Sequence, residues 1–224
     1  MARGRYLGRL KLRPLPPELA ERYLLEWHPR QLALQPEQFP MLTSQAIFHN
    51  DLPLEVEIGA GSGEFARSLA AADPQANVLA IELSNRAAQR AAWLAAEAAL
   101  PNLKVLRADF KLLAPKLPAA GWRRVYLHFP DPQLKAADAK RIIFTPQFLD
   151  AMALTLPPGG ELSVVSDKPS FFMQMLELAE DDGRFAKTHP ERYLQGFEPP
   201  VKSRFQLIWE RKGRTSHQFI LKRL

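Results

Sequence analysis

Five acidic residues stand at or just after the end of short apolar runs that are typical of β-strands, namely Glu57, Glu82, Asp109, Asp131 and Asp167. The first four lie roughly 25 residues apart, which is close to the length of one strand-plus-helix unit. Open α/β sheets bind their ligands in the crevice outside the carboxyl ends of parallel strands. The spacing therefore predicts a row of carboxylates along the ligand-binding edge of a parallel sheet.

Apolar runs, helix caps and turn residues predict alternating strands and helices from residue 54 onwards. A final antiparallel pair is expected from RFQLIWE (204–210) and HQFILKR (217–223). The fold class is thus α/β, a doubly wound and mostly parallel sheet with an antiparallel C-terminal strand. The other expected strands are 54–58, 77–83, 102–108, 123–128 and 161–166, and the expected helices are 64–71, 85–99, 112–117, 144–156 and one beginning near residue 171.

The length of 224 residues suits one large α/β domain. Residues 1–50 are expected to be a Pro-rich, basic N-terminal extension, irregular apart from one short helix at 17–27. Residues 51–224 are expected to form the domain that carries the acidic row.

The composition excludes several kinds of chemistry and favours one kind of partner. The chain has no cysteine, which removes disulfides, thiolate nucleophiles and cysteine-based metal sites, and its five histidines show no metal-ligand spacing, so no metal is expected. No apolar run approaches the ~20 residues of a membrane span, and the N-terminus lacks the apolar core of a secretory signal. The cytoplasm is the expected location. A net charge of +6 favours a polyanionic partner.

A glycine-rich loop follows the first strand of the domain, with Gly59, Gly61 and Gly63 ahead of a helix, and Glu82 ends the next strand. Such a loop lets a ligand approach the backbone closely, and the acidic residue suits ribose hydroxyls. The dinucleotide fingerprint would place its third glycine where Glu64 stands, and a carboxylate there would repel a pyrophosphate. S-adenosylmethionine, a cationic nucleoside without phosphates, is the better fit.

The remaining acids suit the same ligand. Glu57 lies two residues ahead of the first glycine and can face the cofactor's amino group, and Asp109 can accept from the adenine amine. Asp131 lies between two prolines in HFPDPQLK, which fixes its backbone. A carboxylate fixed at a strand end indicates function rather than packing.

The chain resembles the bacterial tRNA (guanine-N7)-methyltransferase family through VEIGAGSG, AIEL, VLRAD, HFPDPQLK with KRI, VVSD and IWERKG, in that order. The resemblance runs from about Leu54 to the C-terminus, and FPDP is its most specific segment. It implies a Rossmann-like, seven-stranded, S-adenosylmethionine-dependent methyltransferase. It also implies methyl transfer to N7 of a tRNA guanosine, the one at position 46 in the variable loop.

The resemblance also implies roles for individual residues. Glu57, Glu82 and Asp109 match the family's cofactor-binding acids, together with the three glycines of the loop. Asp131 matches the catalytic aspartate, beside the cofactor. The matched tRNA-contact positions are Lys135, Asp167 and Glu210.

The chain departs from the family pattern around the target base. Gln133 replaces the usual tryptophan after FPDP, Ser166 and Leu207 replace threonines, and the basic run after FPDP is thinned to KAADAKRI. Basic residues on either side of these positions are expected to contact RNA phosphates. These are Lys140 and Arg141 beside Asp131, and Arg5, Arg9 and Lys11 in the N-terminal arm.

Guanine N7 carries a lone pair and no proton, so the reaction needs in-line placement rather than a general base. Asp131 is expected to accept from the Watson–Crick edge of the guanine and to offset the positive charge that methylation creates. Two alternatives stay open: a methyltransferase acting on another RNA or a small molecule, and a tRNA-binding relative without turnover. No protein partner is implied, and the oligomeric state is open.

Overall fold

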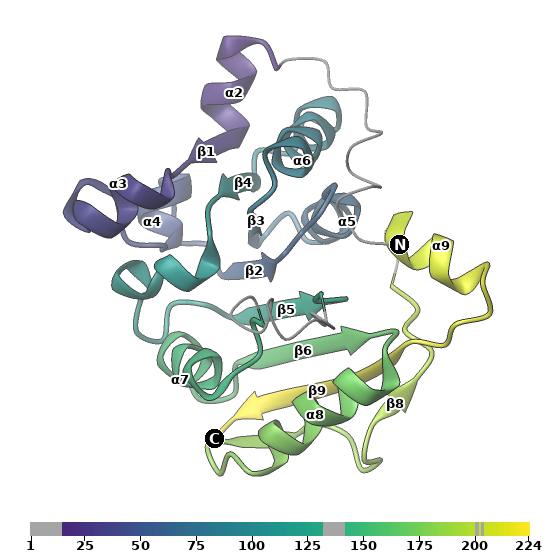
Figure 1. Cartoon of the computed structure of the whole chain (residues 1–224). Coiled ribbons are helices and arrows are strands. Elements are labelled where there is room, and N and C mark those ends of the chain that lie inside the picture. Colours follow the sequence, from purple (N-terminus) through teal and green to yellow (C-terminus); the bar gives the residue numbers. More distant parts are fainter. Residues whose placement is uncertain (1–14, 132–141, 200–201, 203) are drawn as a thin grey trace.

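One nine-stranded sheet organises the protein, with strand order β1-β4-β3-β2-β5-β6-β9-β7 and with β8 beside β9 (Figure 1). The computed structural model describes residues 15–131, 142–199, 202 and 204–224, without the side chains of 204 and 205. The strands are β1 (Leu24–Glu26), β2 (Leu54–Ile58), β3 (Asn77–Glu82), β4 (Leu103–Arg107), β5 (Arg124–His128), β6 (Glu161–Ser166), β7 (Phe185–Lys187), β8 (Leu194–Gln195) and β9 (His217–Arg223).

The first six strands in sequence order pair in parallel, so their carboxyl ends lie at one edge. Strand β9 runs antiparallel to β6, β7 and β8, so its amino end reaches the same edge. Strand β2 lies between β3 and β5, and the strand order reverses there. Such a switch point is where ligands bind in sheets of this kind.

Helices cover both faces of the sheet, and two apolar cores lie between the layers. Alternate residues of β3 show the division, since Val78 and Ala80 belong to one core and Leu79 and Ile81 to the other. The first core packs against α2 (Pro17–Tyr23), α5 (Glu64–Ala72) and α6 (Asn85–Glu97). The second packs against α3 (Pro29–Leu34), α4 (Ser44–Phe48), α7 (Pro146–Thr155) and α8 (Pro169–Glu180).

The prediction that residues 204–210 form a strand is wrong, because Arg204–Glu210 is helix α9. The side-chain amide of Gln206 donates to the carbonyl of Phe197. It also donates, one helical turn ahead, to Glu210 Oε1 at 2.8 Å. The strand beside β9 is instead the short β7. The arrowheads of β5 and β6 point toward α9 in Figure 1, so this helix stands at the carboxyl edge.

Smaller differences concern lengths and counts. The sheet has nine strands rather than seven, because β1 and β8 extend the expected set. The helix expected at 17–27 ends at Tyr23, and the chain continues as β1, which pairs with β4. Residues 15–50 hold more regular structure than expected. The helix expected at 112–117 is replaced by two 3₁₀ turns, Phe110–Leu112 and Ala114–Lys116, and a third turn spans Pro36–Gln38.

The helices of the described residues are too short or too polar for any of them to cross a lipid bilayer.

Candidate active site at the carboxyl edge

The structure places all five acids of the predicted row at the carboxyl edge. Glu57 pairs in register with Ala80, and Glu82 ends β3. Asp109 and Asp131 follow β4 and β5, and Asp167 follows β6 directly. The strand order arranges them across the sheet as Asp109, Glu82, Glu57, Asp131 and Asp167. Glu57 therefore lies on β2 and Asp131 follows the neighbouring strand β5, on the two sides of the switch point.

The glycine loop is a rigid turn held by its neighbour strand. Gly59, Gly61 and Gly63 have φ values of 78°, 60° and 83°, a left-handed conformation that side chains disfavour. The backbone N–H groups of Gly59 and Ala60 both donate to the carbonyl of Ile81. A Cβ at Gly63 would lie 2.5 Å from that of Ala91, so glycine here lets α5 and α6 pack closely.

Glu82 is oriented by backbone donors on both sides. One carboxylate oxygen accepts from Gly61 N at 2.8 Å and the other accepts from Ser84 N, also at 2.8 Å. The side chain is buried. Each carboxylate oxygen has two acceptor positions, so the group can still accept from ligand hydroxyls. Glu82 thus fixes the glycine loop while it faces the edge.

Glu57 and Asp109 complete this side of the row. Glu57 is buried near the end of β2. Asp109 is half-buried and caps the following 3₁₀ turn, where its Oδ1 accepts from Lys111 N at 3.1 Å. The backbone of the turn thus orients the Asp109 carboxylate, and Glu57 is placed by its position on β2.

Asp131 is exposed and follows a strained backbone segment. Phe129 has φ 52°, which is unusual for a bulky residue, and more so directly before a proline. Its N–H donates to the carbonyl of Val165 at 2.7 Å, and its ring is buried. Such strain persists only where the surroundings impose it, and it is common at functional sites.

A buried polar pair lies beneath this segment. His128 Nε2 lies 3.0 Å from Ser163 Oγ, which also accepts from the amide of Gln218. The imidazole packs against the rings of Phe65 and Phe197, with centroids 4.7 Å away in each case. Burial lowers the pKa of His128 to about 3, so the ring is neutral at ordinary pH and acts in packing.

The two acids predicted to contact tRNA are held by cations of the same chain. Asp167 Oδ2 lies 2.6 Å from Arg214 Nη1, and only 6% of the Asp167 side chain is exposed. Glu210 accepts from Lys202 at 3.0 Å and from Gln206 at 2.8 Å. Partial burial acts to raise the pKa of Glu210, but these two hydrogen bonds hold it below its ordinary value.

The other predicted RNA contacts lie outside the described residues, namely Lys135, Lys140, Arg141, Arg5, Arg9 and Lys11. Gln133, one of the departures from the family pattern, lies outside them as well. Residues missed at the sequence level are Lys168, Lys212 and Arg214, whose side chains surround the Trp209 ring. The basic run RKGRTS before β9 is the sequence signal for Lys212 and Arg214, and Lys168 follows Asp167 directly. Within the described ranges, no three His, Asp or Glu side chains are grouped so that they could hold a metal.

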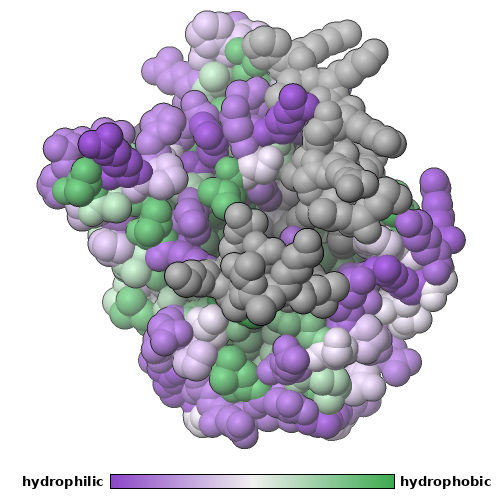
Figure 2. Space-filling view, in the orientation of Figure 1, coloured by the Kyte–Doolittle hydropathy of each residue, from purple (hydrophilic) through white to green (hydrophobic). Residues whose placement is uncertain are grey.

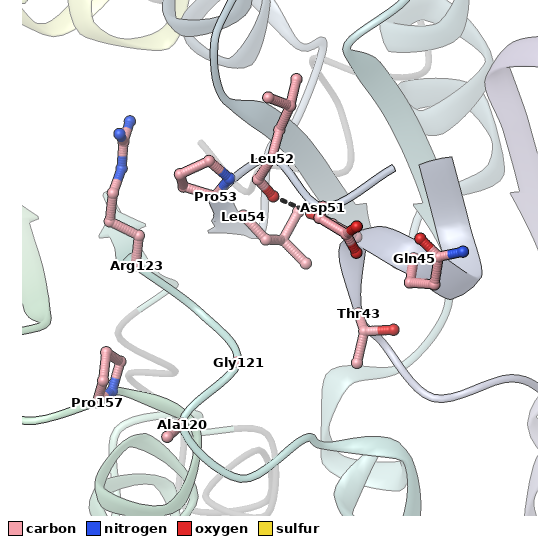
Figure 3. Close-up of a pocket in the computed structure, with 11 residues that line it drawn as sticks. Thr43, Gln45, Asp51, Leu52, Pro53, Leu54, Ala120, Gly121, Arg123 and Pro157 are labelled. Carbon is pink, nitrogen blue, oxygen red and sulfur yellow. Dashed lines mark hydrogen bonds between the residues drawn. The ribbon is translucent and has the colours of Figure 1, made fainter. Parts of the chain in front are cut away.

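A surface pocket lies at the opposite edge of the sheet (Figure 3). Leu54 at the start of β2 and Arg123 just before β5 line it, so it opens at the amino ends of the strands. Arg123 is tied to Glu55 at 2.6 Å and to Asp73 at 2.9 Å. These contacts join β2 to the turn after α5, so the pocket residues serve the fold rather than the acidic row.

Comparisons with known proteins identify relatives along most of the chain. A family described as "Putative methyltransferase" matches residues 51–219. A protein of Rubrobacter xylanophilus named tRNA (guanine-N(7)-)-methyltransferase is 47% identical over 98% of both chains. One of the same name from Chloroherpeton thalassium is 36% identical over 98% of this chain and 97% of its own. Among solved structures, the 16S rRNA methyltransferase KamB is similar in fold, with TM-score 0.57, 19% identity, and coverage of 81% of this chain and 95% of that one.

Proposed function

Because the chain belongs to the tRNA (guanine-N7)-methyltransferase family, we propose that its acidic row binds S-adenosylmethionine beside a guanosine of the tRNA variable loop, at position 46. The protein is a methyltransferase that modifies N7 of guanine in tRNA. One observation carries the residue assignment. The switch point between β2 and β5 brings Glu57 and the glycine loop next to Asp131.

The residues on the β2–β4 side suit the cofactor. Glycines at left-handed φ leave the loop without side chains, so a ligand can lie against the backbone. Glu82 accepts from ribose hydroxyls, in an orientation that Gly61 N and Ser84 N fix. Glu57 accepts from the amino group of the methionine part, and Asp109 from the adenine amine. When bound, S-adenosylmethionine supplies an electrophilic methyl group on a sulfonium centre.

Asp131 receives the base. Its exposed carboxylate, held after the strained turn at Phe129, accepts from the N1 and N2 donors of guanine and so orients N7. N7 needs no deprotonation, so placement is the main task of the protein. The negative charge of Asp131 also offsets the positive charge that develops on the ring. The guanosine leaves its stack to reach the edge, at a cost of a few kcal/mol.

The tRNA lies over the β5–β6 side. Asp167, Glu210 and Lys135 contact the target nucleotide and its neighbours. Lys140, Arg141, Arg5, Arg9 and Lys11 bind backbone phosphates. A tRNA substrate also makes the cytoplasm the location we propose.

Product analysis tests this function. Purified protein is incubated with unmodified tRNA and methyl-labelled S-adenosylmethionine, the RNA is digested, and the labelled nucleoside is identified. Label in 7-methylguanosine, lost when guanosine 46 is replaced by adenosine, supports the proposal. Label at another guanosine contradicts the position, and label in another nucleoside contradicts the substrate. Binding of tRNA without label contradicts turnover.

A further inference from the structure

Three cations of the chain converge on one indole ring beside the acidic row. The guanidinium carbon of Arg214 lies 3.6 Å from the centroid of the Trp209 ring, Lys212 Nζ lies 4.8 Å from it, and Lys168 Nζ lies 5.5 Å from it. Lys212 and Arg214 come from the loop between α9 and β9, and Lys168 comes from the turn after β6. We call Lys168, Trp209, Lys212 and Arg214 the cation cluster.

Like charges this close repel one another, so the cluster depends on compensating negative charge. The face of an indole ring attracts cations, but it carries no net charge. Asp167 supplies one negative charge through its 2.6 Å contact with Arg214. The carboxylate is almost fully buried, whereas a third of the Arg214 side chain is exposed. The cluster therefore keeps an excess of positive charge at the surface, suited to an anion.

Trp209 could instead be a platform for base stacking, but the guanidinium at 3.6 Å covers one face of its ring. Figure 2 shows hydrophilic residues gathered at the right of the molecule, where Figure 1 places α9. A ring that holds cations at such a surface favours phosphate contact over base contact.

We propose that the cation cluster is a phosphate-binding subsite for the RNA backbone, and that a phosphate bound there draws Arg214 away from Asp167. The freed carboxylate of Asp167 then accepts from the donors of a nucleotide base. This inference rests on the proposed function, since it takes tRNA as the ligand. In the free protein Arg214 occupies the Asp167 carboxylate, and binding of the RNA phosphate frees that carboxylate.

The first measurement is tRNA binding as a function of salt concentration. Each of Lys168→Gln, Lys212→Gln and Arg214→Gln removes one phosphate contact and should reduce the slope of log K against log salt by about one. The matched control is Arg184→Gln. Like Arg214, Arg184 is paired with acidic side chains, in its case Asp182 at 2.7 Å and Asp150 at 2.8 Å. It lies just before β7, away from the carboxyl edge. Slopes equal to wild type in all three cluster variants would overturn the subsite.

The second measurement separates release of Asp167 from a fixed ion pair. If Arg214 leaves Asp167 in the bound complex, Arg214→Gln should raise KM about tenfold and keep kcat within twofold, whereas Asp167→Asn should lower kcat at least tenfold. Equal loss of kcat in the two variants would show that the pair stays together, and would overturn the release step.

Three controls complete the test. Lys212→Gln leaves the Asp167–Arg214 pair in place, so the subsite remains testable if Arg214→Gln folds poorly. Binding of S-adenosylhomocysteine should be unchanged in all cluster variants. Failure of the proposed function would appear separately, as wild-type protein that forms no 7-methylguanosine.

Discussion

The two sides of the acidic row hold their carboxylates by different means. On the cofactor half, which we define as β2, β3, β4 and the loops after them, Glu82 and Asp109 accept from backbone N–H groups. On the RNA half, defined as β5, β6, α9 and β9, Asp167 and Glu210 are paired with Arg214 and Lys202. Backbone donors are fixed by the fold, whereas long cationic side chains can change partners. We therefore expect the cofactor half to be pre-formed and the RNA half to exchange contacts when its ligand binds.

The largest effect is expected at Asp131, where the two halves meet. Asp131→Asn keeps the size of the side chain and removes its charge, so kcat should fall about 100- to 1,000-fold, as for the loss of one group that stabilises transition-state charge. Single-turnover methyl transfer measures it, with thermal unfolding as the control for folding. A variant within threefold of wild type would remove Asp131 from the chemistry.

Within the cofactor half, a substitution at the closely packed Gly63 should lower the free energy of unfolding most. Gly63→Ala forces a left-handed residue against Ala91, and we expect a loss of about 3 kcal/mol from backbone strain and overpacking together. Gly159→Ala is the matched control, since Gly159 has φ 84° but nothing within 4 Å of an added Cβ. It should cost only about 1–2 kcal/mol. Equal losses in urea unfolding would show that the α5–α6 contact is not tight.

Glu82 tests whether the cofactor half is fixed by backbone donors. Glu82→Gln offers one acceptor oxygen to two N–H groups, so Gly61 N or Ser84 N loses its partner. Affinity for S-adenosylhomocysteine should fall about tenfold or more, since a hydrogen bond to a charged group contributes about 1.5–3 kcal/mol. Calorimetric titration measures this loss. An unchanged affinity would mean that the ligand does not use Glu82.

The smallest effect concerns the buried pair of His128 and Ser163 in the RNA half. Folded His128 stays neutral because burial lowers its pKa to about 3, whereas the unfolded chain binds a proton near the ordinary pKa of 6.5. The unfolded state thus holds one more proton between these values, and this residue's share of the unfolding free energy falls by about 1.4 kcal/mol per pH unit below 6.5.

The His128→Gln variant takes up no such proton on unfolding, so it is the reference against which wild type is compared. The difference in unfolding free energy between wild type and variant should shrink as pH falls from 7 to 5. A difference that does not change with pH would mean that the folded histidine titrates normally.

The contrast between the cofactor half and the RNA half also explains which parts of the site could be predicted from the sequence. The cofactor half follows from local signals, because Leu54–Ile58, the glycines and α5 are consecutive and Glu82 ends the next strand. The RNA half depends on partners far apart in the chain. Arg214 and Asp167 are 47 residues apart, and no local pattern joins them.

The wrong prediction falls in the same half. Residues 204–210 have the alternating aromatic and aliphatic pattern of a strand, but contacts from Gln206 to Phe197 and Glu210 favour the helix. The strand next to β9 comes from the three residues of β7, too short a segment for a periodic signal. For helix α9 and for strand β7 alike, contacts with other parts of the chain decide the structure, and the segment's own residue pattern does not.

We infer above all that the two halves of the acidic row bind different ligands by different means. The direct test titrates S-adenosylhomocysteine and tRNA into two variants, Glu82→Gln and Arg214→Gln. We predict that Glu82→Gln weakens S-adenosylhomocysteine binding about tenfold or more and leaves tRNA affinity within about twofold, while Arg214→Gln does the reverse. If either variant weakened both ligands by the same factor, the division of the acidic row into a cofactor half and an RNA half would be contradicted.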